Sequence, residues 1–576
     1  MKSERAYVPP LLAERRAWGF GINLYALRSQ RNWGIGDFTD LRRFVRIAAA
    51  AGADTVGINP LHALHYVEPE AASPYSPTSR YFINPLYLDI EAVPEFARAH
   101  ERAAALRARV ASGGFVATLA ALRETPHVAY GRVARAKYGA LEACYEILGE
   151  VGGERLTTFR TYAEGGGARL ERFALYEALT ERFLRDDGGA RGWQHWPRDY
   201  RDPAGDAVRA FAAAARKRID YFKYIQWLTD EQLAAAALEA RALALGLYLD
   251  VAVGVDRNSG DVWCDASAFV LDETIGAPPD LLGSLGQNWG LAPLVPEAIL
   301  RDGGAAFAEL LASNMRYAGA LRLDHVMALF RVFRIPFGET AASGRYIEYP
   351  FDAALAVVRA ASEDARCLVI GEDIGNVPPG FRERMQREAI FSYRPLLFER
   401  EDDRALYAPE RYPAFALATA TTHDMPTLVG WTIGRDIDTH AAIGLTPPER
   451  SELAHNARRV DVSSLFEALR GAGELDDAAV ARLQQRVDER RAEAGTFDEF
   501  VRASYRYLAR SPARLVLVQL DDALGELDPV NLPGTDAEYP NWRRKSAIDI
   551  DRLASDPRLQ ALVADVRRVL GERTDR

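Results

Sequence analysis

Short apolar runs recur along the chain and alternate with longer stretches in which apolar residues follow helical spacing. The predicted strands span residues 21–26, 54–60, 247–253, 320–326, 367–374, 392–398, 416–422 and 515–520. Helical spacing is clear between them, for example at 41–51 and 351–362. Alternation of strand and helix is typical of a parallel sheet, and eight such units predict an α/β fold, the TIM (β/α)8 barrel.

Two segments between predicted strands are much longer than ordinary connections. We expect one catalytic barrel over 1–576, with an inserted loop and helical subdomain at 61–246 and a helical insertion at 425–514. Because only a helix, at 557–570, is predicted after residue 520, no C-terminal β-sandwich domain is expected. An open doubly wound sheet is less favoured, since no G-x-G-x-x-G follows the first strand.

One further segment, 276–296, is rich in glycine and proline and reads GAPPDLLGSLGQNWGLAPLVP. These residues favour turns and interrupt regular structure. We therefore predict a loop of defined shape that is neither helix nor strand.

Composition narrows the class of function. The formal net charge of −10 argues against a nucleic-acid partner and suits a neutral small-molecule substrate. The three cysteines are far apart and lack metal-ligand spacing, so we expect reduced thiols. No apolar run is long enough to span a bilayer. These features predict a cytoplasmic protein that binds neither membrane nor nucleic acid.

Acidic residues occur where several predicted strands end. Arg322 and Asp324 share one face of the fourth strand, because side chains alternate along a strand. An isolated Arg-x-Asp pair is more often a buried ion pair than a site. Asp250, Glu372 and Asp424 end three other strands, however. Since barrel strands end at one common face, we expect these acids to converge.

Three carboxylates could bind Mg²⁺ or Ca²⁺, or they could cleave a glycosidic bond with retention. Retention needs a nucleophile and a proton donor about 5–5.5 Å apart. Arg322 would hold Asp324 ionised, as a nucleophile requires, whereas Glu372 has no basic neighbour in sequence and could keep a proton. The alternative for Glu372-Asp373 is an acid pair at a helix N-terminus.

At this point the chain resembles a known family. The matching segments are NWGIGDF from Asn32, SPYSPTSRYFINP from Ser73, SGDVW from Ser259, GAPPDLLGSLGQNWG from Gly276, LRLDHV from Leu321, GEDIG from Gly371, TTHDMPT from Thr421 and NLPGTDAEYPNWRRK from Asn531. In this order they resemble the amylomaltases, the 4-α-glucanotransferases of glycoside hydrolase family 77, relatives of the α-amylases.

The resemblance implies a role for each matching residue. Asp324 would be the nucleophile, Glu372 the general acid/base and Asp424 the third acid. The implied substrate-binding residues are Arg322, His423, Asp250, Tyr75, Asp280, Gln287, Trp289 and His325. Asp250 stands in LDVAV, where many members have Gly-Asp and a proline, so its substrate contact follows less directly. The resemblance implies neither a cofactor nor a metal.

The expected function is therefore 4-α-glucan transfer by double displacement, with maltooligosaccharides or starch- or glycogen-derived α-1,4-glucans as substrates. A plain α-glucan hydrolase would use the same three acids, and water exclusion at the acceptor side would separate the two. A metal-dependent barrel hydrolase and a non-catalytic glucan-binding barrel are the remaining alternatives. The presence of Asp324, Glu372 and Asp424 argues against the last.

Overall fold

Eight parallel strands close into a barrel in the computed structural model, which describes residues 4–187, 192–279, 285–401, 404–493 and 495–572. The strands are β1 (Ala17–Ile22), β2 (Thr55–Ile58), β5 (Gly246–Val251), β8 (Ala320–Leu323), β11 (Leu368–Gly371), β12 (Phe391–Pro395), β13 (Ala416–Thr419) and β14 (Leu515–Gln519). Each pairs with the next in this order, and β14 closes onto β1. The TIM-barrel prediction is confirmed.

The observed strand boundaries differ from those predicted, and β1 and β12 show why. β1 ends at Ile22, and the predicted strand residues Leu24–Ala26 form a 3-10 helix. The Leu24 N–H bonds to the side chain of Asn59 at 2.8 Å, which takes this residue out of the sheet. Similarly, β12 ends at Pro395, and Leu396–Phe398 form a 3-10 turn. Both apolar runs continue past the strand, so their pattern could not mark its end.

The barrel interior contains large side chains next to glycines. A Cβ on Gly57 of β2 would lie 2.6 Å from the ring of Tyr248, and one on Gly21 of β1 would lie 2.4 Å from Gln519. Glycine at these positions makes room for side chains from the neighbouring strands. Leu12, from the short helix before β1, packs with Leu368 and other apolar residues inside the barrel.

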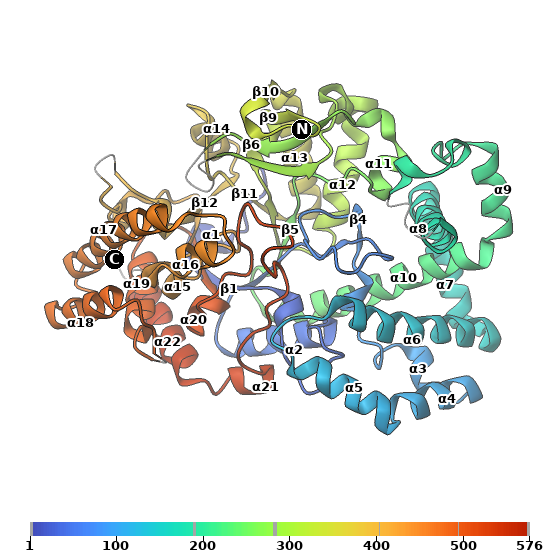
Figure 1. The fold of residues 1–576 in the computed structure, drawn as a ribbon, viewed down its shortest axis with the longest axis horizontal. Helices are drawn as coiled ribbons and strands as arrows, with labels where there is room; N and C mark the ends of the chain where they lie inside the picture. The colour runs from blue at the N-terminus through green and yellow to red at the C-terminus, as the bar shows by residue number, and fades with distance from the viewer. Residues whose placement is uncertain (1–3, 188–191, 280–284, 402–403, 494, 573–576) are drawn as a thin grey trace.

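Helices fill both long insertions and also connect the barrel strands (Figure 1). The α-helices of the described residues are as follows. Up to β8 they are α1 (Leu11–Glu14), α2 (Phe38–Ala50), α3 (Pro94–Ala97), α4 (Glu101–Val110), α5 (Gly113–Glu124), α6 (Tyr130–Val151), α7 (Gly153–Gly165), α8 (Gly167–Asp187), α9 (Asp206–Ala214), α10 (Arg216–Glu239), α11 (Gly260–Cys264) and α12 (Ala305–Met315). After it come α13 (Phe351–Ala365), α14 (Phe381–Arg387), α15 (Leu428–Ile433), α16 (Arg435–Ala442), α17 (Pro448–Gly471), α18 (Asp477–Asp488), α19 (Asp498–Ala509), α20 (Leu520–Ala523), α21 (Ile550–Leu553) and α22 (Pro557–Glu572).

The two helical groups lie on opposite sides of the barrel in Figure 1. Helices α4 to α10 of the first insertion are on the right, and α15 to α19 of the second insertion are on the left in orange and red. Among the described residues no single helix is long and apolar enough to cross a membrane, although α4 and α5, bent by 56°, pass that test as a pair. Beyond β14 the chain forms helices and no strand as far as residue 572.

Two antiparallel sheets lie outside the barrel. The larger has the order β10-β9-β6-β7, formed by β10 (Arg345–Glu348), β9 (Arg331–Pro336), β6 (Glu273–Ala277) and β7 (Gln287–Leu291). The smaller pairs β3 (His62–Ala63) with β4 (Ser79–Ile83). The prediction of a loop without strands is therefore wrong at 276–277, which belong to β6, and at 287–291, which form β7. β6 pairs with β9 and β7 pairs with β6, and this pairing stabilises strands that the local glycines disfavour.

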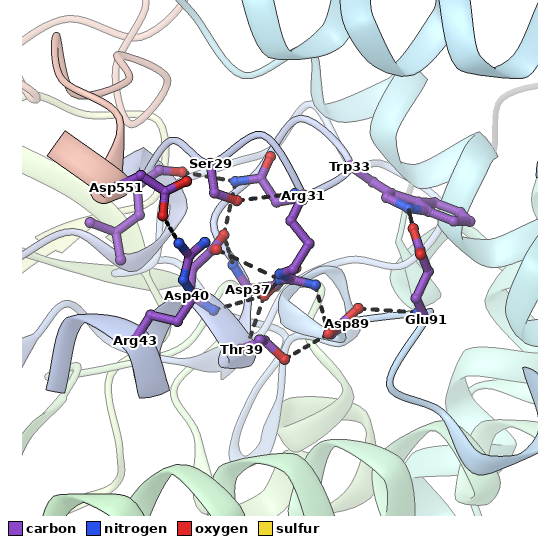
Figure 2. A network of polar contacts seen from close by, with 12 residues as sticks. Ser29, Arg31, Trp33, Asp37, Thr39, Asp40, Arg43, Asp89, Glu91 and Asp551 are labelled. Carbon is purple, nitrogen blue, oxygen red and sulfur yellow. Dashed lines mark hydrogen bonds and ion pairs between the residues drawn. The ribbon is translucent and has the colours of Figure 1, made fainter. Parts of the chain in front are cut away.

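The NWGIGDF motif connects the β1–α2 segment to the chain beyond β4 (Figure 2). Arg31 pairs with Asp37 and also with Asp89, at 2.7 Å, while the Trp33 indole donates to Glu91 at 3.0 Å. Asp37 also caps α2 in a reciprocal capping box with Asp40. These contacts are made within the protein, so the motif stabilises the rim of the barrel.

Candidate active site

A large cleft of about 1550 Å³ opens at the carboxyl ends of the barrel strands. Asp324 and Glu372 line it, directly after β8 and β11, and Asp424 joins them from the segment after β13. The sheet that carries β7 and β9 forms another part of the wall, and the segment 531–543 completes it. Residues far apart in sequence thus meet where barrel enzymes place their active sites.

Arg322 lies at the centre of the acids. Its guanidinium is 2.9 Å from Asp324 and 2.9 Å from both oxygens of Asp250, and 4.0 Å from Glu372. The side chain is only 5% exposed, so these contacts are poorly screened by water. The expected shared orientation of Arg322 and Asp324 is confirmed by this ion pair. A fixed cation favours the ionised form of the carboxylates around it.

Glu372 is held by two backbone N–H groups. The N–H of His325 donates to Oε2 at 2.9 Å, and the N–H of Ile374 donates to Oε1 at 2.6 Å. Burial raises the pKa of Glu372 to about 8, opposed by Arg322 and supported by the negative charge of Asp324. A carboxyl group with this pKa carries its proton at neutral pH and can donate it.

The alternative view of Glu372-Asp373 as a helix N-terminus is wrong, because α14 begins only at Phe381. Asp373 instead accepts from Arg382 at 2.9 Å and from the N–H of Tyr393 at 3.0 Å. The two neighbouring acids therefore have separate surroundings, and only Glu372 lines the cleft.

Asp424 has the opposite protonation preference. The amide of Asn531 donates to Oδ1 at 2.8 Å, and the His423 ring lies 3.0 Å from Oδ2. Its place inside the cleft disfavours the charged form, but the charge of His423 and these contacts outweigh that effect and lower the pKa of Asp424 to about 2. Asp424 is thus ionised at neutral pH in the same cleft as a protonated Glu372.

Tyr75, Asp250 and His423 form one contiguous group at the base of the cleft. The Tyr75 hydroxyl donates to Asp250 at 2.6 Å, and its ring stacks on His423 with centroids 4.7 Å apart. Burial raises the pKa of Asp250 even though Arg322 contacts both of its oxygens. Tyr75 lines the large cleft, whereas Asp250 and His423 line a smaller adjoining cavity of about 60 Å³.

Trp289, Gln287 and His325 form another contacting group on the wall of the cleft. The Trp289 indole donates to the Gln287 side chain at 3.0 Å and meets the His325 ring edge to face, with centroids 5.2 Å apart. His325 has a left-handed backbone, with φ 44°, which directs its N–H to Glu372. Burial lowers the pKa of His325 to about 4, so its ring is neutral at neutral pH. Asp280 lies outside the described residues.

Sequence reasoning missed three residues of this site. Asn531 orients Asp424, and the Trp542 ring lies 5.4 Å from Tyr75 and 5.6 Å from His423. The Tyr393 ring, on β12, is 5.6 Å from the guanidinium of Arg322. Asn531 and Trp542 belong to the segment NLPGTDAEYPNWRRK, which carried the resemblance but had been given no role.

In the part of the chain that the structure describes, no group of three or more His, Cys, Asp or Glu side chains is arranged to hold a metal ion. Arg322 occupies the position between Asp250 and Asp324 where a cation would bind. The arrangement therefore combines an ionised carboxylate, a protonated carboxyl and an aromatic wall, which suits acid-assisted substitution at a sugar carbon.

Comparison with known proteins agrees with this chemistry. The family model described as 4-alpha-glucanotransferase matches residues 22–549. The 4-alpha-glucanotransferase of Haemophilus influenzae is 35% identical over 97% of this chain and 80% of its own length, and that of Mycobacterium tuberculosis is 35% identical over 93% and 72%.

Solved structures agree as well. The amylomaltase of Corynebacterium glutamicum superposes with a TM-score of 0.82 at 29% identity, covering 97% of this chain and 76% of that one. The Streptococcus agalactiae amylomaltase in complex with acarbose shares the fold, with a TM-score of 0.74 at 17% identity over 97% and 99% of the two chains. The chain belongs to the 4-alpha-glucanotransferase family, glycoside hydrolase family 77, whose members transfer α-1,4-glucan segments to acceptor glucans.

Proposed function

We propose that Asp324 attacks the anomeric carbon of a bound α-1,4-glucan while Glu372 protonates the leaving oxygen. The observation that carries this assignment is the contrast around Arg322. Asp324 makes a 2.9 Å ion pair with the guanidinium, whereas Glu372 lies 4.0 Å from it and has a pKa of about 8. Asp324 is paired with a cation, whereas Glu372 keeps a proton, as the roles of nucleophile and proton donor require.

In the second half of the reaction, Glu372 removes a proton from the acceptor 4-hydroxyl, which attacks the glucosyl ester on Asp324. Asp424 would accept hydrogen bonds from sugar hydroxyls, since its pKa of about 2 keeps it ionised throughout. Tyr75 and Trp289 supply apolar area for sugar faces in the same cleft. An acceptor ordered between them competes with water because its hydroxyl is already positioned.

The products formed from maltotriose test this function. A transferase should convert maltotriose into glucose and a ladder of longer glucans, while the total number of reducing ends stays nearly constant. Thin-layer or anion-exchange chromatography resolves the ladder, and a reducing-sugar assay follows the total. A steady rise in reducing ends without longer products would instead identify a hydrolase.

Activity should decline at alkaline pH. The protonated form of Glu372 is the donor, and it is lost as pH rises through about 8. We expect kcat/KM for maltotriose to fall about tenfold per pH unit above that value. A glucosyl or maltosyl fluoride has a leaving group that needs no proton, so fluoride release should lack this decline. An identical alkaline limb with both donors would contradict the assignment of Glu372.

Trp289→Ala should weaken transfer without unfolding the protein. The indole lies on the cleft wall against His325, and its loss removes one aromatic contact. By analogy with stacking on nucleobases, kcat/KM should fall by an amount equivalent to roughly 1–3 kcal/mol. Trp289→Phe should recover most of the loss. Unfolding of Trp289→Ala, measured by circular dichroism, would show that the residue serves packing instead.

We also propose that the enzyme acts in the cytoplasm on starch- or glycogen-derived glucans. Cys144, Cys264 and Cys367 are unpaired, as is usual for proteins of a reducing compartment. Burial raises the pKa of Cys144 and Cys264 to about 12, so neither forms a reactive thiolate.

A further inference from the structure

Phe337 is an exposed aromatic residue on the wall of the cleft. It is 62% exposed, and among the described residues it is the one aromatic member of the exposed large hydrophobic side chains. Single exposed aliphatic residues are common on protein surfaces, but Phe337 also lines the same cleft as Asp324 and Glu372. Its exposure therefore coincides with a place where a substrate could cover it.

The ring of Phe337 is held in place from behind. The guanidinium of Arg257 lies 3.6 Å from the ring centroid and covers one face. The N–H of Phe337 donates to the carbonyl of Asp272 at 2.8 Å, and Gly338 follows with φ +86°, a turn conformation that favours glycine. A ring fixed in this way loses little conformational freedom when a ligand stacks on the remaining face.

Phe337 lies at one end of β9, along the wall of the cleft. Both Arg331, the first residue of β9, and Phe337, just after its last residue, line the cleft. Six steps along a strand span roughly 20 Å. Arg331 follows the segment that carries Asp324 and His325, so β9 places Phe337 at about that distance along the cleft from the end of this segment.

Polar groups accompany the ring. Asn288 of β7 and Glu339, two residues after Phe337, line the same cleft, and the Asn288 amide donates to the Glu339 carbonyl at 3.2 Å. An aromatic face with neighbouring amide and carboxylate groups matches a pyranose ring, which has apolar faces and a rim of hydroxyls.

We propose that Phe337 is a distal subsite that stacks on a glucose unit of long α-1,4-glucans, remote from the bond that is cleaved. The proposal rests on the glucan-transferase function and adds a preference for chain length. A trisaccharide bound across the acids ends short of Phe337, whereas a longer chain running along the β9 side of the cleft reaches it. Phe337 then increases the affinity for long chains alone.

The test compares maltoheptaose with maltotriose as the donor for wild type and Phe337→Ala. We expect kcat/KM for maltoheptaose to fall about tenfold, the effect of one lost stacking contact, and kcat/KM for maltotriose to change less than about twofold. Phe337→Tyr and Phe337→Trp should restore the preference, because either ring can stack. In the inactive Asp324→Asn background, calorimetry should show the same weakening of the Kd for maltoheptaose.

A matched control is Leu453→Ala on α17, which removes a 69% exposed apolar side chain outside the cleft. This variant should leave kcat/KM unchanged for both maltoheptaose and maltotriose. Equal losses with both donors, or no loss with maltoheptaose, would overturn the subsite. Failure of the wild-type enzyme to form a ladder from maltotriose would instead refute the proposed function, so the two ideas fail separately.

Discussion

Asp324→Asn is expected to abolish glucan transfer, with a loss of about 10⁴-fold or more in kcat for maltotriose. An amide cannot form the glucosyl ester, so neither the ladder nor glucose should appear. The substitution keeps the size of the side chain and alters its 2.9 Å ion pair with Arg322. Product analysis at long incubation times measures the residual activity.

The control for this variant is Asp436→Asn on α16. Asp436 also makes an ion pair with an arginine, Arg458, through two 2.9 Å contacts, but it lies outside the cleft. Asp436→Asn should lower stability at most and leave kcat per folded molecule unchanged. Full activity in Asp324→Asn would contradict the assignment of Asp324 as the nucleophile.

Glu372→Gln is expected to reduce activity strongly with maltotriose but not the first step with maltosyl fluoride. With maltotriose, the alcohol leaving group needs a proton, so activity should fall by about 10²–10⁴-fold. With a maltosyl fluoride, the first step needs no acid, and a burst of fluoride release should persist. Transfer to the acceptor then slows, because no base removes the proton from its 4-hydroxyl. Stopped-flow fluoride detection combined with chromatography follows both steps.

Glu474→Gln provides a matched control for Glu372→Gln. Glu474 is likewise buried, and it binds Arg506 at 2.6 Å away from the cleft. Glu474→Gln should affect activity with maltotriose and with maltosyl fluoride to the same extent. Equal loss with fluoride and maltotriose in Glu372→Gln would show that Glu372 acts only through the structure of the site.

Much of the fold could be predicted because the relevant signals are local. The runs at 320–326 and 416–422 alternate with amphipathic helices, and burial of both faces of a parallel strand requires such apolar runs. All eight predicted strands occur in the barrel. The antiparallel sheet of β6, β7, β9 and β10 could not be predicted in this way, because β6 pairs with β9, which follows it only after a helix and a barrel strand in the sequence.

For the candidate site too, the sequence determined some features and the tertiary structure determined others. The sequence by itself determined that Asp324, Glu372 and Asp424 lie at or after the carboxyl ends of separate barrel strands, since each belongs to or follows an apolar run of strand length. Only the tertiary structure decided the protonation of Glu372 and Asp424. Burial and distance from Arg322 keep Glu372 protonated, and Asn531, over a hundred residues away in sequence, helps to keep Asp424 ionised. Burial, ion pairing and the exposure of Phe337 depend on contacts between distant segments, which local periodicity does not encode.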